Sequence, residues 1–359
     1  MSDLAYKSEI RDSVIQSLLE KVRKRSYESY LVSVRLGKIR LFRGVQINFD
    51  FPVTALIGPN GGGKSTILGA SACIFDSIIP ENIFPKSRIG DEAMDDWRIE
   101  YSIVDKRANP KGPIQAEVTL RKNKWSRSHA FSKHIKIFGI SRTVPAIENP
   151  LFALKKKLSV HGHPRGSLSI STDKVDNIDH IKREAERILG KSLANFRLIQ
   201  ITYSVIKKRQ KKKRQVASKE ILEDTKSRNE SSKKISTYTQ KQYMYLGNDG
   251  ENNYSEFNFG SGEASVIRMI ADIESLPDCS LVLIEEIENG LHPLAIHRTV
   301  EYLMEVAKRK SIQVIFTTHS DYALAPLPSE AIWASFDGKL QQGKLSVEVV
   351  RAVSGRIDK

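Results

Sequence analysis

The chain has few cysteines and no long apolar run, and each shortage excludes a class of protein. Only two cysteines, Cys73 and Cys279, occur among its 359 residues, and they form no CxxC pair. We therefore expect neither a disulfide framework nor a cysteine zinc site, and we interpret both cysteines as small buried hydrophobic residues. No apolar stretch approaches the roughly 18 residues needed to span a bilayer. We expect no membrane partner.

The N-terminal stretch also lacks the features of a targeting segment. MSDLAYKSEIRDSV carries acidic residues early and has no uninterrupted apolar core of the kind found in a secretory signal. We therefore expect a cytoplasmic protein.

Acidic residues are too few to balance the basic ones. The chain has 57 lysines and arginines against 42 aspartates and glutamates, a formal net charge of +15. Such an excess favours a polyanionic partner, such as DNA or an acidic DNA-mimic protein. Part of it is local, because seven of the eight residues of KKRQKKKR (207–214) are basic. A solvated, disordered loop and an anion-binding arm both fit such a run.

Apolar periodicity predicts alternating helices and strands. Residues 8–25 have the pattern of an amphipathic helix, which we expect to pack on the core of its own chain rather than on a partner. The lysine-rich and serine-rich stretch 205–253 is typical of a mobile loop or an exposed excursion. We predict strands at 53–57, 98–104, 114–120, 280–284 and 312–316, and helices at 65–75 and 294–310. Strand, helix and strand in succession favour a parallel sheet and an α/β fold.

The stretch GPNGGGKST has the complete pattern of a phosphate-binding P-loop between a predicted strand and a predicted helix. Its glycines let backbone amides and the helix N-terminus point at phosphate oxygens. Lys64 is expected to reach the β- and γ-phosphates of ATP, and Ser65 to ligate Mg²⁺. The expected nucleotide-binding residues are Gly58, Pro59, Asn60, Gly61, Gly62, Gly63, Lys64, Ser65 and Thr66.

Three glutamates, Glu285, Glu286 and Glu288, follow the apolar stretch LVLI in LVLIEEIENGLHP (281–293). Carboxylates this close together raise one another's proton affinity, so they suit a place where a cation or a proton transfer requires them. Beside a P-loop, Glu285 is expected to ligate Mg²⁺ and Glu286 to act as the general base. We interpret Glu288 as a loop or interface residue.

Two further motifs lie at the ends of predicted elements. NFGSGEA precedes a helix, and TTHS follows a strand. In NFGSGEA, Ser261, Gly262 and Glu263 open a helix whose N-terminus can bind a second anion. We expect them to face a nucleotide held by another copy of the chain. TTHS places His319 at the end of the last buried strand, where it is expected to contact the γ-phosphate, although a lone histidine is usually structural.

Together these four motifs resemble the ABC-type ATPase head of RecF, SMC and OLD-family proteins, the AAA15/AAA21 group. The resemblance covers residues 31–145 and 255–340. It implies a P-loop NTPase fold with a mostly parallel sheet core, an antiparallel β subdomain and a helical, basic insertion. It also implies a homodimer or higher homo-oligomer with shared ATP sites, in which Ser261 and Gly262 close over the partner's nucleotide. Asn289, Gly290, Leu291 and His292 would form the loop through which the paired sites communicate.

The resemblance also suggests how the chain is divided. The expected parts are an N-terminal amphipathic helix (1–30), an ATPase lobe with the P-loop (31–145), a basic, partly disordered insertion (146–254) and a second lobe with the remaining motifs (255–359).

The sequence departs from the ATPase-head pattern at two places. Glu285 stands where most members have aspartate, so hydrolysis is expected to be slow. The glutamine loop of the family has no clear counterpart. Gln115 and Gln200 are the candidates, and ordinary strand-surface glutamines are the alternative.

Features outside the motifs favour a switch that controls another protein. No sustained heptads separate Thr66 from Gly260, which argues against a long SMC-type arm. Too few residues follow His319 for the Toprim nuclease domain of OLD proteins. Stretches 84–105 and 330–355 resemble the stand-alone ATPase subunit of the PARIS anti-phage system, whose effector is a separate Toprim-type nuclease.

The alternative is a RecF-like ATPase that binds DNA in repair. A transporter motor fits poorly, because the basic insertion and the GLHP loop are foreign to that class.

Replacing the seven basic residues of 207–214 by serine tests the anion-binding arm. Each lost phosphate contact should lower the salt slope of binding to duplex DNA by roughly 0.9. We expect a shallower slope in a salt titration of binding and little change in ATP hydrolysis without polyanion. Superimposable titrations of the wild type and the serine variant would instead support a solvated loop.

Overall fold

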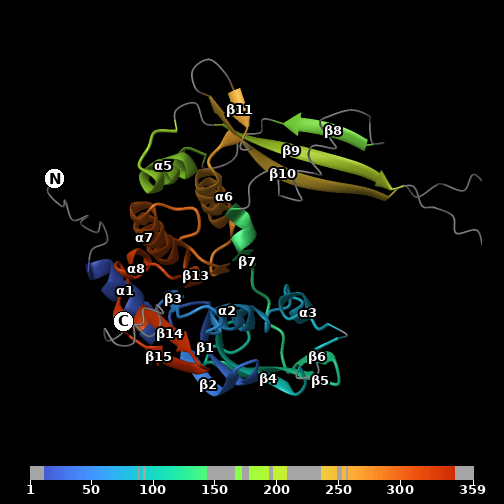
Figure 1. Cartoon of the computed structure of the whole chain (residues 1–359), viewed down its shortest axis with the longest axis vertical. Coiled ribbons are helices and arrows are strands. Elements are labelled where there is room, and N and C mark those ends of the chain that lie inside the picture. Colours follow the sequence, from blue (N-terminus) through green and yellow to red (C-terminus); the bar gives the residue numbers. More distant parts are fainter. Residues whose placement is uncertain are drawn as a thin grey trace, which may run out of the picture. The chain divides into compact units, whose positions relative to one another are not determined.

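The computed structural model divides the chain into two compact units, which are coloured along the sequence in Figure 1. The first unit comprises Met1–Val144, Asp179–Ser192 and Gly260–Lys359, and the second comprises Pro145–Ile178 and Leu193–Phe259. The residues that the structure describes are 12–87, 89–91, 94–143, 166–171, 178–193, 197–207, 236–248, 253–255 and 258–343. Among them, no helix is both long and apolar enough to cross a membrane.

A six-stranded sheet forms the centre of the first unit, in the order β15-β14-β3-β13-β12-β7. Its strands are β3 (Val53–Ile57), β7 (Ile135–Phe138), β12 (Leu281–Ile284), β13 (Gln313–Thr317), β14 (Ile332–Phe336) and β15 (Lys339–Gln342). All neighbours are parallel except β14 and β15. Every residue of β3, β12 and β13 is buried, as expected of strands covered on both faces. The prediction of a mostly parallel α/β core is confirmed.

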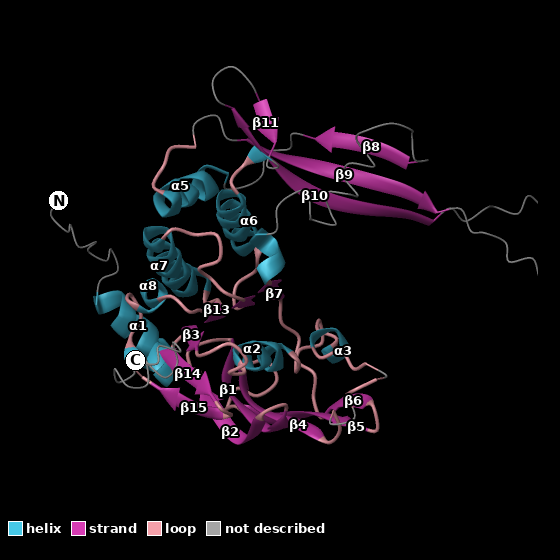
Figure 2. Cartoon of the chain, viewed as in Figure 1, coloured by secondary structure: helices cyan, strands magenta, loops and turns pink. Residues whose placement is uncertain are grey.

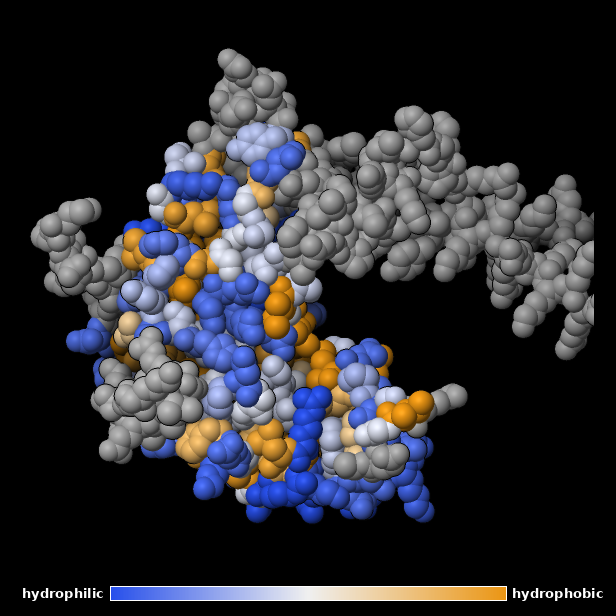
Figure 3. Space-filling model, viewed as in Figure 1, coloured by the Kyte–Doolittle hydropathy of each residue, from blue (hydrophilic) through white to orange (hydrophobic). Residues whose placement is uncertain are grey.

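A five-stranded antiparallel sheet lies beside this core, in the order β2-β1-β4-β5-β6. Its strands are β1 (Ser29–Ile39), β2 (Phe42–Asn48), β4 (Trp97–Asp105), β5 (Ile114–Arg121) and β6 (Lys124–Arg127). Hydrophilic residues gather over β2, β4 and β5 at the lower edge of the view in Figure 3. Between β4 and β5, Arg98 pairs with Glu100 and Glu117 at 3.0 Å each. This sheet is the predicted antiparallel β subdomain.

The first unit also contains several helices, some of which lie against its sheets (Figure 2). They are α1 (Asp12–Arg23), α2 (Lys64–Ala72), α3 (Pro80–Ile83), α5 (Ile178–Leu189), α6 (Ser261–Ser275), α7 (Pro293–Lys310) and α8 (Asp321–Leu324), with 3₁₀ turns η1 (Ile140–Thr143) and η3 (Ser329–Ala331). Apolar residues of α2 share one core with both sheets. The Tyr101 hydroxyl of β4 also donates a hydrogen bond of 2.7 Å to the Ala70 carbonyl of α2.

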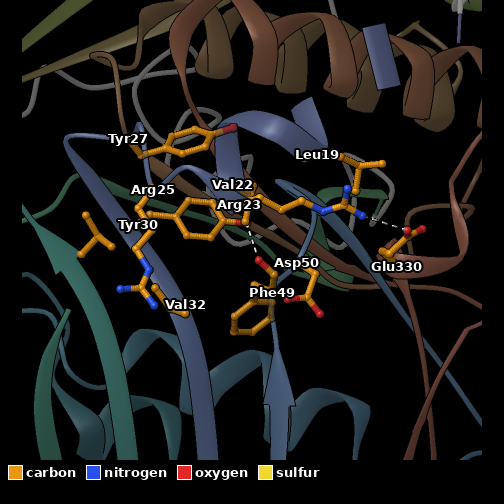
Figure 4. Close-up of a pocket in the computed structure, with 11 residues that line it drawn as sticks. Leu19, Val22, Arg23, Arg25, Tyr27, Tyr30, Val32, Phe49, Asp50 and Glu330 are labelled. Atoms are coloured by element: carbon orange, nitrogen blue, oxygen red, sulfur yellow. Dashed lines mark hydrogen bonds and ion pairs between the residues drawn. The ribbon is translucent and has the colours of Figure 1, made fainter. Parts of the chain in front are cut away.

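Helix α1 packs on its own chain, as predicted, through the buried residues Leu18 and Leu19. Beside it lies a pocket of about 290 Å³, lined by α1, β1 and the β2–β3 turn (Figure 4). The Tyr30 hydroxyl donates to the Phe49 carbonyl at 2.7 Å on one side of this pocket. Arg23 and Glu330 approach within 3.7 Å on the other.

Two expectations need correction. Cys73 is buried as predicted, but Cys279 is only half-buried, in a turn with a positive φ of 61° before β12. Of the two expectations for 205–253, a mobile loop or an exposed excursion, the mobile loop is wrong for residues 205–207, 236–248 and 253, which belong to strands. Threonine and tyrosine recur in that stretch and favour extended backbone despite its low apolar content.

The second unit is built on a four-stranded antiparallel sheet in the order β11-β10-β9-β8. Its strands are β8 (Gly166–Ser171), β9 (Arg197–Lys207), β10 (Ser236–Asn248) and β11 (Asn253–Ser255). The long strands β9 and β10 pair over eleven residues of β9, with Arg197 opposite Leu246 at one end and Lys207 opposite Ser236 at the other. Of the basic run, Lys207 ends β9, and the other six basic residues lie outside the described residues.

One buried glutamine joins the two sheets of the first unit. Gln313 of β13 is fully buried; its Nε2 donates to the Leu31 carbonyl at 2.9 Å, and its Oε1 accepts from the Leu31 N–H at 3.0 Å. Leu31 lies at a register shift in the β1–β4 pairing, so the side chain of Gln313 completes the hydrogen bonding of its peptide groups.

Substituting Gln313→Leu tests this link. The variant keeps the approximate volume but leaves the buried N–H and C=O of Leu31 without these partners, at about 1–3 kcal/mol for each group. We expect the free energy of unfolding to fall by about 2–4 kcal/mol in urea denaturation. Gln115→Leu, at an exposed site on β5, is the control and should change it by less than about 0.5 kcal/mol. A loss below about 1 kcal/mol in Gln313→Leu would contradict the link.

Candidate nucleotide-binding site

The P-loop joins β3 to α2 through a backbone that only glycine can follow. Gly58, Gly61 and Gly63 have φ angles of 150°, 77° and 94°. A Cβ at Gly58 would lie 2.1 Å from the Ser335 carbonyl oxygen, and one at Gly63 would lie 2.4 Å from the Phe42 ring. The loop is therefore held tightly between β14 and β2, and α2 begins at its end with the N–H groups of its first turn outside the helical ladder.

Lys64 is the buried cation of this loop. Its side chain lies with Nζ 2.8 Å from the Gly58 carbonyl and 3.0 Å from the Pro59 carbonyl, donating to both. Burial lowers the pKa of Lys64, and the carboxylates of Glu286 and Glu288 oppose this shift. The ammonium group is thus fixed on the concave side of the loop, where the P-loop pattern places it against phosphates.

A pocket of about 300 Å³, which we call the P-loop pocket, brings most of the predicted site residues together. The P-loop, the glutamates after β12 and the histidine after β13 all contribute. Four lining residues were not predicted as part of the site: Arg40, Leu41, Ile140 and Thr317. The complete lining is Arg40, Leu41, Asn60, Gly61, Gly62, Gly63, Lys64, Ser65, Thr66, Ile140, Glu285, Glu286, Thr317 and His319.

The two glutamates after β12 occupy a tight turn. Glu286 has a positive φ of 46°, in the left-handed region that is unfavourable for a residue with a side chain. Its N–H donates to the Thr317 hydroxyl at 2.8 Å, and the Glu285 N–H donates to the Phe138 carbonyl at 2.8 Å. Neighbouring strand ends therefore hold this turn, with both glutamates in the lining of the P-loop pocket.

Glu288 holds the loop that carries His319. One carboxylate oxygen accepts from the Thr318 hydroxyl and the other from the His319 N–H, each at 2.7 Å. From the sequence, Glu288 is interpreted as a loop or interface residue. These contacts add a structural role, because they hold the segment that carries His319. Its contacts come from residues about thirty positions away, and only the parallel pairing of β12 with β13 brings them together.

The residues that open α6 lie outside the lining of the P-loop pocket. Ser261 is exposed, and a Cβ at Gly262 would lie 1.9 Å from the Gly290 carbonyl oxygen, so the helix end packs closely on the loop after β12. Glu263 pairs with Lys191 at 2.6 Å. Within one chain, Ser261, Gly262 and Glu263 are not brought to the P-loop.

The predicted communication loop, residues 289–292, continues from the glutamate turn. The Asn289 N–H donates to the Glu286 carbonyl, and the Leu291 N–H donates to the Glu288 carbonyl, both at 2.9 Å. His292 caps α7, with Pro293 in the first helical position. This loop therefore links the glutamate turn directly to α7.

The P-loop pocket offers oxygen donors of the kind that magnesium uses. Among the described residues, no group of three or more His, Cys, Asp or Glu side chains is placed to hold a metal ion. Ser65 offers a hydroxyl and Glu285 a carboxylate in one pocket. Mg²⁺ is commonly held by one or two such protein oxygens together with substrate phosphates and water.

Arg40 adds a second basic side chain to the P-loop pocket. It lies in the turn between β1 and β2 with a positive φ of 50°, and its Nη1 donates to the Thr66 hydroxyl at 3.1 Å. No local sequence pattern marks it. Of the glutamine-loop candidates, Gln115 lies on β5 and donates to Ser102 at 3.0 Å, outside the pocket lining, and Gln200 belongs to β9 in the second unit.

Residues 53–325 match the model of a family described as "AAA domain, putative AbiEii toxin, Type IV TA system". The chain belongs to this family, AAA_21. The match runs from β3 to α8 and therefore contains all four motifs of this AAA_21 protein. No curated protein matches the sequence.

This AAA_21 chain is similar to several solved structures. An SMC head bound to the C-winged helix domain of ScpA is 15% identical, with 89% of this chain and 98% of that chain covered and a TM-score of 0.52. RecF with ATP is 13% identical, with 88% and 98% covered and a TM-score of 0.47. CbiO1 of Clostridium perfringens, part of an ABC transporter, is 14% identical, with 87% and 88% covered and a TM-score of 0.39. The predicted fold, an ABC-type P-loop ATPase head, is confirmed.

Lys64→Ala tests the nucleotide site. The change removes the buried cation of the P-loop, so we expect affinity for a fluorescent ATP analogue to fall at least about 100-fold, or about 2.8 kcal/mol. Lys38→Ala on β1, outside the pocket lining, should leave the affinity within about twofold, since surface changes are usually small. Unchanged affinity in Lys64→Ala would contradict the site.

Proposed function

We propose that this chain is a magnesium-dependent ATPase that acts as a molecular switch. The observation that carries the proposal is the composition of the P-loop pocket, in which Lys64, Ser65, Glu285, Glu286 and His319 line one space. A phosphate cradle, a metal-ligand pair and a candidate base are the parts that phosphoryl transfer requires.

Each side chain has one task in this proposal. The P-loop amides and Lys64 bind the β- and γ-phosphates, and Ser65 and Glu285 would hold Mg²⁺, which supplies charge neutralisation. Glu286 orients and deprotonates the attacking water, and His319 contacts the γ-phosphate. Glu285 in place of the shorter aspartate makes slow turnover the expectation, as suits a switch.

A second copy of the chain completes the site. Ser261 is exposed at the start of α6, outside the P-loop pocket of its own chain. A helix N-terminus with an exposed serine suits contact with the γ-phosphate of a nucleotide held by a partner head. We therefore propose a homodimer or higher homo-oligomer that closes on ATP.

The switch is proposed to control a separate effector, a Toprim-type nuclease in anti-phage defence. The AAA_21 description refers to a putative AbiEii toxin of a Type IV TA system, which supports a role in a system of paired components. The +15 charge supports an acidic trigger, either DNA or a DNA-mimic protein. The same charge favours a second candidate, a RecF-like ATPase that binds DNA during repair.

Glu286→Gln tests the switch mechanism. The amide cannot accept the proton of the attacking water, so we expect turnover to fall at least about 100-fold with ATP affinity within about threefold. Mass photometry should show ATP-dependent dimers that persist longer than those of the wild type. Glu330→Gln, on η3, is the matched control. Turnover of Glu286→Gln at the wild-type rate would contradict the role of Glu286.

The trapped Glu286→Gln variant is also the bait that separates the two candidate functions. Expressed in the native host and purified with ATP, it should co-purify a nuclease if the chain controls an effector. DNA together with recombination proteins would instead support the repair function.

A further inference from the structure

We propose that Arg142 is a positioning residue for ATP hydrolysis, which holds the backbone of Glu285 and Glu286 so that both carboxylates stay in the P-loop pocket. The inference rests on the proposed ATPase function, and it concerns a residue that does not itself line the pocket.

The guanidinium group of Arg142 contacts consecutive peptide groups of the glutamate turn. Its Nη1 donates to the Glu285 carbonyl and, at 3.2 Å, to the Gly139 carbonyl; its Nη2 donates to the Glu286 carbonyl. The planar fork of arginine suits such a bidentate contact, whereas lysine offers a single ammonium.

Strand pairing delivers Arg142 to this position. It lies in η1, directly after β7, and β7 pairs in parallel with β12 so that Phe138 lies opposite Ile284. The chain therefore leaves both strands at the same sheet edge. η1 also lies against the neighbouring loop, because the Thr143 methyl would be 3.4 Å from a Cβ at Gly290.

The glutamate turn needs such support, because Glu286 has a positive φ of 46°. A non-glycine residue in this region persists when the surrounding structure holds it there. The Thr317 hydroxyl accepts from the Glu286 N–H, and the Asn289 N–H shares the Glu286 carbonyl with Arg142. Arg142 binds the carbonyls of Glu285 and Glu286 at the same time. Without it, the backbone of both residues could rotate and both carboxylates would lose their fixed orientation.

Charge adds to this geometry. Burial lowers the pKa of Arg142, and the charges of Glu288, Glu286 and Glu285 oppose that shift. The charges of Glu286 and Glu288 act on the pKa of Lys64 in the same way. Arginine keeps its charge in proteins, so Arg142 provides a permanent counter-charge to the glutamate cluster.

Arg142→Lys is the decisive variant, because it keeps the charge and loses the fork. We expect kcat to fall about 10- to 100-fold, as a displacement of about 1 Å at a catalytic group does. ATP affinity measured without metal should stay within about threefold, since the P-loop is untouched. Mn²⁺ affinity of the ATP complex, measured by EPR as a probe of Glu285, should weaken about three- to tenfold.

Arg127→Lys is the matched control. Arg127 also donates to two backbone carbonyls, those of Cys73 and Ile78, but it lies on β6 and outside the P-loop pocket. We expect the two lysine variants to lose thermal stability to a similar extent. Arg127→Lys should keep kcat and Mn²⁺ affinity within about twofold, as expected of a change away from the site.

Several outcomes would overturn the role of Arg142. In the first, the wild type hydrolyses ATP and the kcat of Arg142→Lys stays within twofold of the wild-type value. In the second, Arg142→Lys loses as much ATP affinity, measured without metal, as it loses kcat. If Arg142→Lys does not fold, Thr317→Val removes a different bond to the same turn and must show the same split between kcat and affinity. A wild type without ATPase activity would contradict the proposed function, and unchanged Mn²⁺ affinity in Arg142→Lys would then overturn the positioning role separately.

Discussion

The alignment of parallel strand ends is the constraint on which the P-loop pocket depends. β3 pairs with β13 and β13 with β12, so the P-loop, the threonine–histidine segment and the glutamates leave the sheet at one edge. β7 joins the same edge beside β12 and brings η1 with it. A register shift of a single residue would move every side chain of the shifted strand to the opposite face, so the buried apolar side chains of these strands also maintain the site.

The parts of the fold and site that are encoded locally were predictable from the sequence. The strands at 53–57 and 281–284 are short and mostly apolar, and the glycine loop between strand and helix has one well-known use. Lys64, Glu285, Glu286 and His319 each follow a buried strand within a few residues. Their assembly into one pocket follows from the rule that parallel strands end together.

The remaining features depend on contacts between distant segments. Arg40, Arg142 and Glu288 contact groups that neighbouring sequence does not reveal, and a basic or acidic residue in a loop has many possible partners. The β9–β10 pairing was also missed, since polar strands that lack a clean apolar face give a weak alternating signal. Here cross-strand pairing, rather than local composition, determines the structure.

The glutamate turn is where these contacts converge. Its N–H groups are bound by β7 and β13, its carbonyls by η1 and the 289–292 loop, and Gly290 of that loop packs against Gly262 at the start of α6. A nucleotide from a partner head that contacts Ser261 would therefore press on a helix end that touches this loop. Because close-packed backbone segments move together, such a contact would displace the glutamate turn and therefore Glu286. In the proposed dimer, the packing of Gly262 on Gly290 would thus give a short route from dimer closure to the glutamate turn.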